Sequence, residues 1–361
     1  MGTLSQEQLA EILFGIREFV DNPKNPHVLD RRQMPGLSMA MKWKKTVPFI
    51  NNKITLKYKS EADELDMQIW SNLDELGFEE FRTGFDLTFE GVQLHMGLKF
   101  VHQELKDQGF IIVPNSPRSQ NFASSMSRAE GLRLFDTLKE KMESALDRYD
   151  VIFDQKLLHN VSGNAAEPAA ITDYISKTPT VGTFGGRSRS DAQMQNPVNL
   201  ASTNASFERD INSLLRQCML YNRGFKGAGV DVIRAASGWI DRYSNATRDI
   251  ANGFRQQTGI SKPGPVDIGI SDTMWQFNGI PVVYDPTMDL MAQLTGDATW
   301  NRRAYGLNTK TWCLGVGQSE DKLITFPPDP GNQRVTRGSI DTRYTLYNFN
   351  PRSNFVHEFA A

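Results

Sequence analysis

The side chains that most often perform catalysis or bind metals are few and scattered in this sequence. None of the five histidines lies four residues from another, and the segment HQEL at 102–105 lacks the second histidine of a zinc-binding helix. The two cysteines, Cys218 and Cys313, are too few for a disulfide framework or a cysteine-based zinc site. The histidines are His27, His95, His102, His159 and His357. The sequence therefore predicts no metal site and no cofactor.

Motifs for nucleophilic catalysis and phosphate binding are absent or incomplete. The chain has no GxSxG elbow and no GxxxxGK loop. A glycine-rich run supplies Gly182, Gly185 and Gly186, followed by Arg187 and Arg189. A phosphate-cradling loop needs a strand before it and a helix directly after it, and neither pattern is present. A surface loop is the favoured interpretation.

One carboxylate occupies a position where a catalytic acid or base could lie. Asp285 follows a pattern typical of a buried strand and precedes Pro286. An aspartate in this position more often caps a turn than performs chemistry. A Ser–His–Asp set assembled from distant residues stays open at this point, and no feature favours one. We predict a capping role for Asp285 and no enzymatic activity.

Composition and charge set further bounds. The chain has 361 residues, a net charge of -2 and a hydrophobic fraction of 39%, with a mean hydropathy of -0.45. A dedicated nucleic-acid binder would show a concentrated basic surface, and the three lysines around Trp43 are too few. The low apolar content, with 28 glycines and 17 prolines, suits two domains, or one body with extensions, in an extended shape.

We expect neither secretion nor a membrane span. The first five residues, MGTLS, carry no basic region of the kind that begins a signal peptide. No apolar run approaches the roughly 20 residues that are needed to cross a bilayer. The expected protein is soluble and is made inside a cell.

A long helix is the element around which the other segments are arranged. Residues 127–160 predict a rod roughly 50 Å long, with Ser127 and Glu130 as a capping box. Apolar residues recur every three or four positions along it, which places them on one stripe: Phe135, Leu138, Met142, Leu146, Tyr149, Ile152 or Phe153, and Leu157. This pattern fits an ordinary core helix or a spine against which other segments and neighbouring chains lie.

Two segments before the long helix favour contacts outside a compact body. Residues 5–20 predict an amphipathic helix whose stripe contains Leu9, Ile12, Ile16 and Phe19. Its polar face is largely acidic, so docking on this or a neighbouring subunit is favoured over membrane binding. The prolines in 21–48 favour extended chain.

Strand patterns flank a protruding loop and then alternate with helices. The alternation of Ile54 and Leu56, and of Phe85 and Phe89, with polar residues predicts two strands around an acidic run, which together form a long hairpin. After the long helix, helical and strand patterns alternate over 165–318, as in a mixed α/β domain. Two further strands close the chain, and we expect them beside the long helix.

The last third of the chain contains two neighbouring segments that resemble the signature of a known family. WQFNGIPVVYDPTMD (275–289), followed by NRRAYGLNTKTW (301–312), resembles the corresponding pair in tailed-phage major capsid proteins of the Hong Kong 97 type. TFGGRSRS (183–190) resembles the family's Gly-Gly-polar-Arg stretch, although 193–196 replaces a Trp-rich segment. The closing RYTLYNFNPRSNFVHEFA is also similar to the family's last strands.

The resemblance implies an α+β fold of the Hong Kong 97 type with four parts. These are an N-terminal arm (1–49), an extended loop (50–94), a peripheral domain (95–162 and 320–361) with a spine helix (127–160), and an axial domain (163–319). The low apolar content fits this reading, because arms and loops bury their apolar residues on neighbours.

The resemblance also implies a non-enzymatic shell subunit. Such a subunit forms hexamers and pentamers of itself in an icosahedral head around double-stranded DNA, which it contacts without sequence specificity. Separate scaffold, portal and decoration proteins are further expected partners, and no membrane is. The protein would be made in the host cytoplasm and located in the virion. The expected interface residues are Leu9, Ile12, Ile16 and Phe19 in the arm, and Ile54, Leu56, Phe85 and Phe89 in the loop.

Two alternatives stand beside this reading. A cellular nanocompartment (encapsulin-like) shell would share the fold and would enclose a cargo enzyme in place of DNA. A soluble two-domain hydrolase would be a monomer or small oligomer with a ligand pocket in the 163–319 region.

Overall fold

The computed structural model describes residues 2–5, 12, 35–58, 85–101, 107, 110–113, 128–160, 169–220, 229–249, 257–258, 273–325 and 335–360. Helices and strands are mixed in it, as the sequence predicts. The α-helices are α2 (Pro35–Trp43), α4 (Arg128–Leu158), α5 (Ile171–Tyr174), α6 (Phe207–Leu220), α7 (Ser237–Asp249) and α8 (Pro286–Thr295). Short 3₁₀ turns are η3 (Ala192–Met194), η4 (Ala298–Arg302), η5 (Thr309–Thr311) and η6 (Pro351–Ser353). In these parts of the chain, no helix is both long and apolar enough to cross a membrane.

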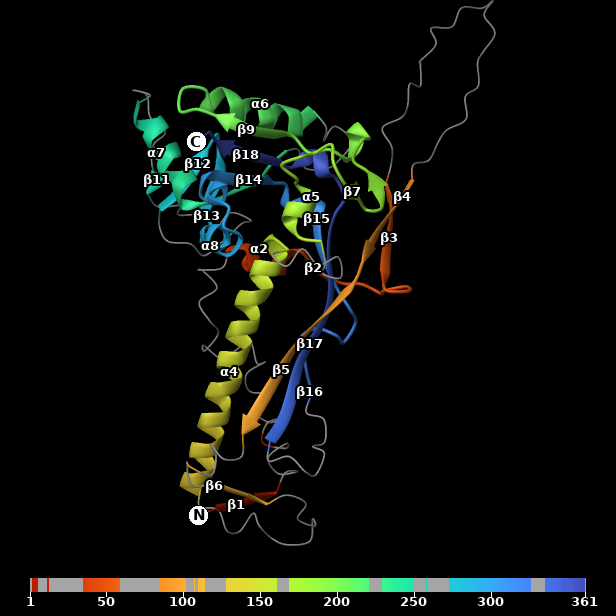
Figure 1. The fold of residues 1–361 in the computed structure, drawn as a ribbon, viewed down its shortest axis with the longest axis vertical. Coiled ribbons are helices and arrows are strands. Elements are labelled where there is room, and N and C mark those ends of the chain that lie inside the picture. Colours follow the sequence, from red (N-terminus) through yellow and green to blue (C-terminus); the bar gives the residue numbers. More distant parts are fainter. Residues whose placement is uncertain are drawn as a thin grey trace, which may run out of the picture.

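A seven-stranded mixed sheet forms one end of the molecule (Figure 1). Its strands, in spatial order, are β11 (Gln257–Thr258), β12 (Thr273–Phe277), β13 (Ile280–Tyr284), β10 (Val232–Ala235), β14 (Arg303–Leu307), β18 (Phe355–Phe359) and β9 (Val198–Ser202). Helices α6 and α7 contribute to one apolar cluster on this sheet, around Phe207 and Trp239. Alternate residues of β10 serve two cores, since Ile233 belongs to this cluster and Val232 to the larger one.

A second sheet runs beside the long helix α4. It consists of β16 (Leu323–Thr325), β17 (Val335–Asn348), β15 (Trp312–Val316) and β2 (Lys44–Thr46), with β5 (Val92–Val101) paired to β17. Figure 1 shows α4 and the ribbon of β5, β16 and β17 extending together away from the seven-stranded sheet. The rings of Phe153 on α4 and Tyr344 on β17 pack at 4.7 Å between centroids.

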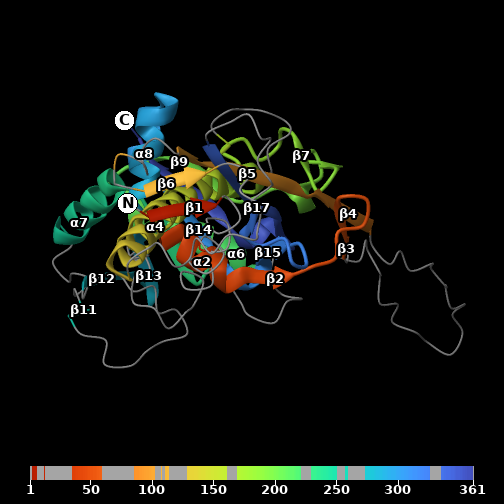
Figure 2. The ribbon, with the colours of Figure 1, turned by 90° about the horizontal axis from the view of Figure 1, so that it is seen from below.

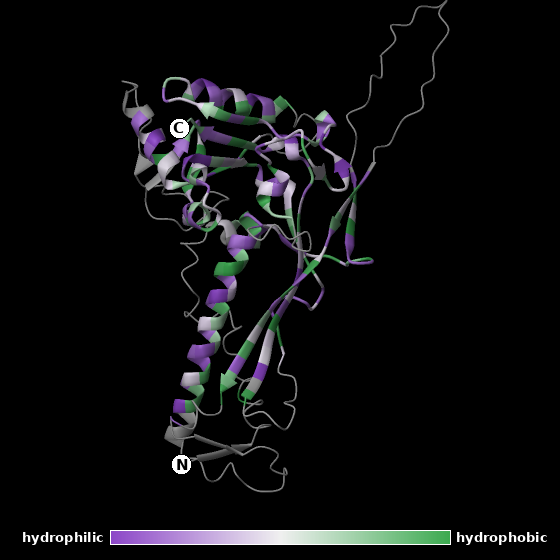
Figure 3. Cartoon of the chain, viewed as in Figure 1, coloured by the Kyte–Doolittle hydropathy of each residue, from purple (hydrophilic) through white to green (hydrophobic). Residues whose placement is uncertain are grey.

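The helix α4 begins and ends within two residues of the predicted limits, and its apolar stripe faces this sheet. Leu138, Met142, Tyr149, Phe153 and Leu157 are buried. Polar and apolar residues alternate along the helix in Figure 3, because a period of about 3.6 residues returns the same face to the core every three or four positions.

Three two-stranded pairings complete the fold. The hairpin of β3 (Lys53–Tyr58) and β4 (Phe85–Glu90) lies at the margin of the molecule, far from α7 (Figure 2). A tight turn joins β7 (Thr183–Phe184) to β8 (Arg187–Ser188). The first strand, β1 (Gly2–Ser5), pairs in parallel with β6 (Phe110–Val113) near the far end of α4 in Figure 1.

Helix α2 corrects the expectation of extended chain over 21–48. Pro35 stands at the start of α2, where proline lacks only an N–H that would be unpaired anyway. Met39, Ala40 and Trp43 are buried, and the Trp43 ring stacks on Trp312 at 5.6 Å. This part of the expected arm is therefore packed in the body of the chain.

The closing strands also depart from the expected division of the chain. We assigned 320–361 to one domain with the long helix, but β18 pairs with β14 and β9 of the seven-stranded sheet. Conversely, β15, assigned to 163–319, pairs with β17. The reason is burial: all five residues of β18 are buried, and a strand between two others in a covered sheet provides that environment.

Candidate functional site

The residues that could do chemistry have structural partners in the described parts of the chain. His95 pairs with Asp341 across β5 and β17, with 2.5 Å between Nδ1 and Oδ1. His357 is buried and accepts a hydrogen bond from the Trp239 indole at 2.8 Å. Cys218 and Cys313 are buried free thiols. No group of three or more metal-ligating side chains gathers in the described ranges, and His27 and His102 lie outside them.

Asp285 is a helix cap within a buried charge cluster. Its carboxylate accepts a hydrogen bond from the backbone N–H of Thr287 at 3.1 Å, at the start of α8, and forms an ion pair with Arg234. The Thr287 hydroxyl donates to Asp154 of α4 at 2.5 Å. A Cβ on Gly36 of α2 would overlap the Arg234 guanidinium. The predicted capping role is confirmed, and the cluster ties α2, α4, β10 and α8 together.

The glycine–arginine run at 182–189 forms the β7–β8 turn, and the buried side chain of Arg189 stabilises it. Arg189 is 1% exposed, and its guanidinium donates to the carbonyl oxygen of Tyr174 at 2.8 Å. It also contacts the Asn196 side-chain oxygen at 3.4 Å. Since these acceptors occupy its guanidinium, Arg189 serves the fold.

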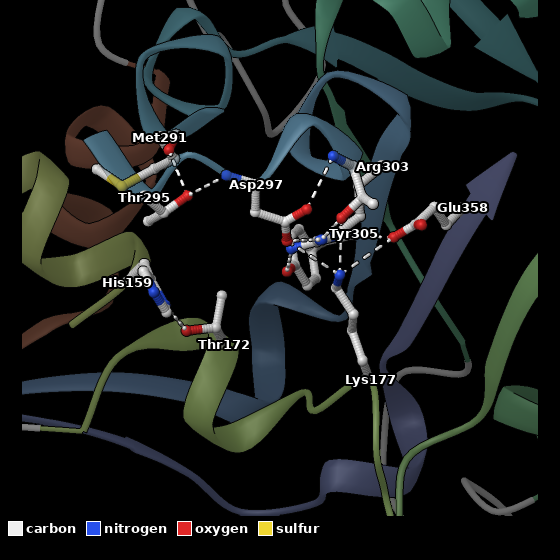
Figure 4. A network of polar contacts seen from close by, with 10 residues as sticks. His159, Thr172, Lys177, Met291, Thr295, Asp297, Arg303, Tyr305 and Glu358 are labelled. Atoms are coloured by element: carbon white, nitrogen blue, oxygen red, sulfur yellow. Dashed lines mark hydrogen bonds and ion pairs between the residues drawn. The ribbon is translucent and has the colours of Figure 1, made fainter. Parts of the chain in front are cut away.

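A charged network joins the end of α4 to the seven-stranded sheet (Figure 4). Arg303 on β14 donates to Glu358 of β18 at 3.2 Å and to Asp297 at 3.3 Å. The ammonium of Lys177 lies 3.3 Å from Asp297 and 3.5 Å from Glu358. Partial burial opposes ionisation of Asp297, but hydrogen bonds from Thr299 and the charge of Lys177 hold its pKa well below the ordinary value.

His159 extends this network to the long helix. Its Nδ1 lies 2.9 Å from the Thr172 hydroxyl, and its ring meets the edge of Trp300 at 5.1 Å. The Arg303 guanidinium covers the same indole at 4.3 Å. Burial lowers the pKa of His159, and the charge of Arg303 adds to this effect while Asp173 opposes it. Together with His159, the side chains of Lys177, Asp297, Arg303 and Glu358 form a charged joint between the end of α4 and the seven-stranded sheet.

Solved structures with a similar fold include capsid structures. The chain matches the "Cyanophage A-1(L) capsid asymmetric unit" with a TM-score of 0.55 at 15% identity, over 94% of this chain and 95% of that chain. It matches "Gordonia phage Cozz" with a TM-score of 0.50 at 14% identity, over 97% and 95% of the two chains. The "Capsid of native GTA particle computed with C5 symmetry" matches with a TM-score of 0.50 at 10% identity, over 95% and 96%.

The fold is one found in capsids. No protein-family model matches the sequence, and no curated protein matches it either. At 10–15% identity the likeness describes the course of the backbone, and the roles of individual side chains must come from this chain's own contacts.

The expected loop residues lie at the base of the β3–β4 hairpin. Ile54 and Phe89 are 6% and 4% exposed, and Leu56 packs against the same core. The Phe89 ring stacks on Tyr347 at 5.7 Å and meets Phe184 edge-on at 5.9 Å. These side chains therefore find partners within one chain and anchor the hairpin. Phe85 pairs with Tyr58 in the backbone register, and its side chain lies outside the described parts.

Of the four expected arm residues, the structure describes only Ile12. Ile12 is helical, half-buried and packed against the main core, whereas Leu9, Ile16 and Phe19 fall outside the described residues. The interface role of both residue sets stays a prediction.

The charged joint was missed by reasoning from sequence. Its members come from four distant segments, which no local spacing connects. A signal was nonetheless present: Arg303, Tyr305 and Asn308 belong to the segment 301–312 that carries the family resemblance. Arg303 bonds Glu358 and the Tyr305 hydroxyl, and Asn308 accepts a hydrogen bond from the backbone N–H of Lys310 at 3.2 Å.

Proposed function

We propose that this chain is a major capsid protein of the Hong Kong 97 type, a shell subunit that assembles with copies of itself as hexamers and pentamers. The shell would be icosahedral and would enclose double-stranded DNA. The observation that carries the proposal is the likeness to capsid structures, which extends over 94% of this chain and 95% of the first of them. Fold likeness restricted to one domain would leave the rest of the chain free for another activity, and here almost nothing is left over.

The division into parts supports the same function, with the corrections described above. The seven-stranded sheet with α6 and α7 would form the axial domain, and α4 with β5, β16 and β17 the peripheral domain. The segment before Pro35 would be the arm, and the β3–β4 hairpin the root of the extended loop. The hydrophobic fraction of only 39% fits a subunit whose stable form is an assembly.

The charge of the chain fits contact with packaged DNA through counterions. With a net charge of -2, the subunit lacks the excess of lysine and arginine that drives nonspecific DNA binding by counterion release. DNA inside the shell would therefore be held by enclosure. Scaffold, portal and decoration proteins would be separate chains, and the virion would be the final location after synthesis in the host cytoplasm.

The test is the size and shape of the protein expressed alone. Light scattering behind a sizing column, with negative-stain microscopy of the leading peak, should find closed shells or rings of five or six subunits. A compact monomer that stays monomeric with a phage scaffold protein co-expressed would overturn the proposal and favour the two-domain hydrolase. Nuclease-protected DNA in shells produced during infection supports the head, whereas a co-purifying cargo enzyme would identify a nanocompartment.

A further inference from the structure

The base of the β3–β4 hairpin rests on the β7–β8 turn. The backbone N–H of Thr88 donates to the carbonyl oxygen of Gly185 at 3.0 Å. Gly185 has φ 54°, and a Cβ there would lie 2.9 Å from the Leu87 Cβ and 3.2 Å from the Phe89 ring. A separation below about 3.0 Å is not found for real Cβ atoms. The turn and the hairpin are therefore in contact at a point where only glycine fits.

A second contact at the base comes from Arg343 of β17. Its guanidinium donates two hydrogen bonds to the Asn52 side-chain oxygen, at 2.7 Å and 3.1 Å, and lies 4.8 Å above the Phe49 ring. The Asn52 amide donates in turn to the carbonyl oxygen of Gly91 at 2.6 Å. Asn52 and Gly91 precede β3 and follow β4, so this contact closes the base of the hairpin.

We propose that these two contacts set the direction in which the hairpin leaves the body of the subunit, and that Gly185 is the positioning residue against which it rests. The partner that this direction serves is a second copy of the chain, which rests on the proposed function. A hairpin held by two contacts at its base acts as a lever, because a small rotation there is multiplied along its length. Its angle would decide whether neighbouring subunits close into one shell size.

The angle can be measured on the unassembled subunit. Spin labels on cysteines at Lys57 of β3 and Ser144 of α4, both exposed, report the distance between hairpin and body by double electron–electron resonance. Cys218 and Cys313 are buried and stay unlabelled in the folded protein. Gly185→Ala should shift or broaden the Lys57–Ser144 distance distribution, because the added methyl group displaces Leu87 and Phe89.

Gly182→Ala is the matched control. Gly182 also has a positive φ, 93°, but nothing lies within 4 Å of a Cβ placed there. Both substitutions carry the cost of a left-handed alanine, and only the one at Gly185 collides with the hairpin. An unchanged distance distribution in Gly185→Ala, or the same shift in Gly182→Ala, would overturn the proposal.

Assembly gives the second readout and separates this proposal from the proposed function. In a chain that forms shells, Gly185→Ala should yield aberrant or mixed sizes in negative-stain images while Gly182→Ala yields wild-type shells. Wild-type-sized shells from Gly185→Ala would contradict the lever. Failure of the wild-type chain to assemble would instead count against the capsid function, and the distance measurement would still decide the role of Gly185.

Discussion

At the scale of single residues, several buried charged side chains in the described parts of the chain make contacts between elements. Arg234 and Asp285 are 1% and 0% exposed, and Asp154 is 2% exposed. Buried charges of this kind are stable only when each has a partner and hydrogen bonds. Asp285, the carboxylate that sequence inspection singles out for chemistry, thus contributes to the scaffold as a helix cap and an ion-pair partner.

Arg234→Ala should lower the free energy of unfolding by about 3–5 kcal/mol, because it leaves the buried Asp285 carboxylate without its cation. Urea denaturation measures this change. Arg209→Ala is the control, since the Arg209 side chain is 80% exposed, and it should change stability by less than about 0.5 kcal/mol. A similar, small change for both variants would contradict the assigned role of Arg234.

The buried imidazole of His357 should make stability depend on pH. Burial lowers the pKa of His357 from its ordinary 6.5 to about 4. Between these values the unfolded chain binds a proton that the folded chain does not, so the free energy of unfolding falls as the pH drops from about 6.5 towards 4, by roughly 2 kcal/mol between pH 7 and pH 5.

His357→Gln isolates this effect, because a glutamine oxygen can still accept the Trp239 hydrogen bond without titrating. Chemical denaturation at pH 7 and pH 5 should show a smaller loss for His357→Gln than for wild type. Equal losses in wild type and His357→Gln would assign the acid sensitivity to other groups.

At the scale of elements, local sequence patterns correctly predict the helices and turns that depend on neighbouring residues in the chain. The periodicity of 127–160 predicts α4, and Asn278-Gly279 predicts a turn, which the structure forms with φ 51° and 80° between β12 and β13. The prolines of 21–48 led to a wrong expectation for α2, because tertiary packing of Trp43 on Trp312 outweighs local preference. Proline is accepted at the first position of a helix, as Pro35 is in α2, but a proline alone does not show whether a helix follows it.

The inner face of α4 should be far more sensitive to truncation than its outer face. Leu138 is 0% exposed, so Leu138→Ala should lower the free energy of unfolding by about 2–5 kcal/mol through lost burial and a cavity. Val151, on the same helix, is 38% exposed, and Val151→Ala should cost under about 1 kcal/mol. Equal denaturant midpoints for Leu138→Ala and Val151→Ala would contradict the orientation of the helix.

At the scale of the whole molecule, the pairings between distant segments lay beyond sequence reasoning. The register of β5 on β17 joins Val92–Val101 to Val335–Tyr344, and no periodicity specifies which strands meet. The charged joint and the hairpin base depend on such pairings, so neither could be assembled from spacing. The resemblance in 275–312 led to the fold because a family signature carries long-range information that periodicity lacks.

The arm is expected to act in assembly. Ile12→Asp combined with Ile16→Asp places two charges on the apolar stripe of 5–20, and burying them on any apolar surface is costly. We expect fewer shells or rings by light scattering. Glu7→Gln with Glu11→Gln on the polar face should assemble as wild type does. Normal assembly of the aspartate variant would refute the docking of the arm.

The position of β18 has a consequence for how the protein is made. A ribosome releases β9, β10 and β14 first, yet β18 lies between β14 and β9 in the finished sheet. The sheet therefore stays open along β14 until residues 355–359 have been translated, and β9 has no partner strand before then. Nascent chains on one messenger RNA thus expose an incomplete sheet until β18 has been released.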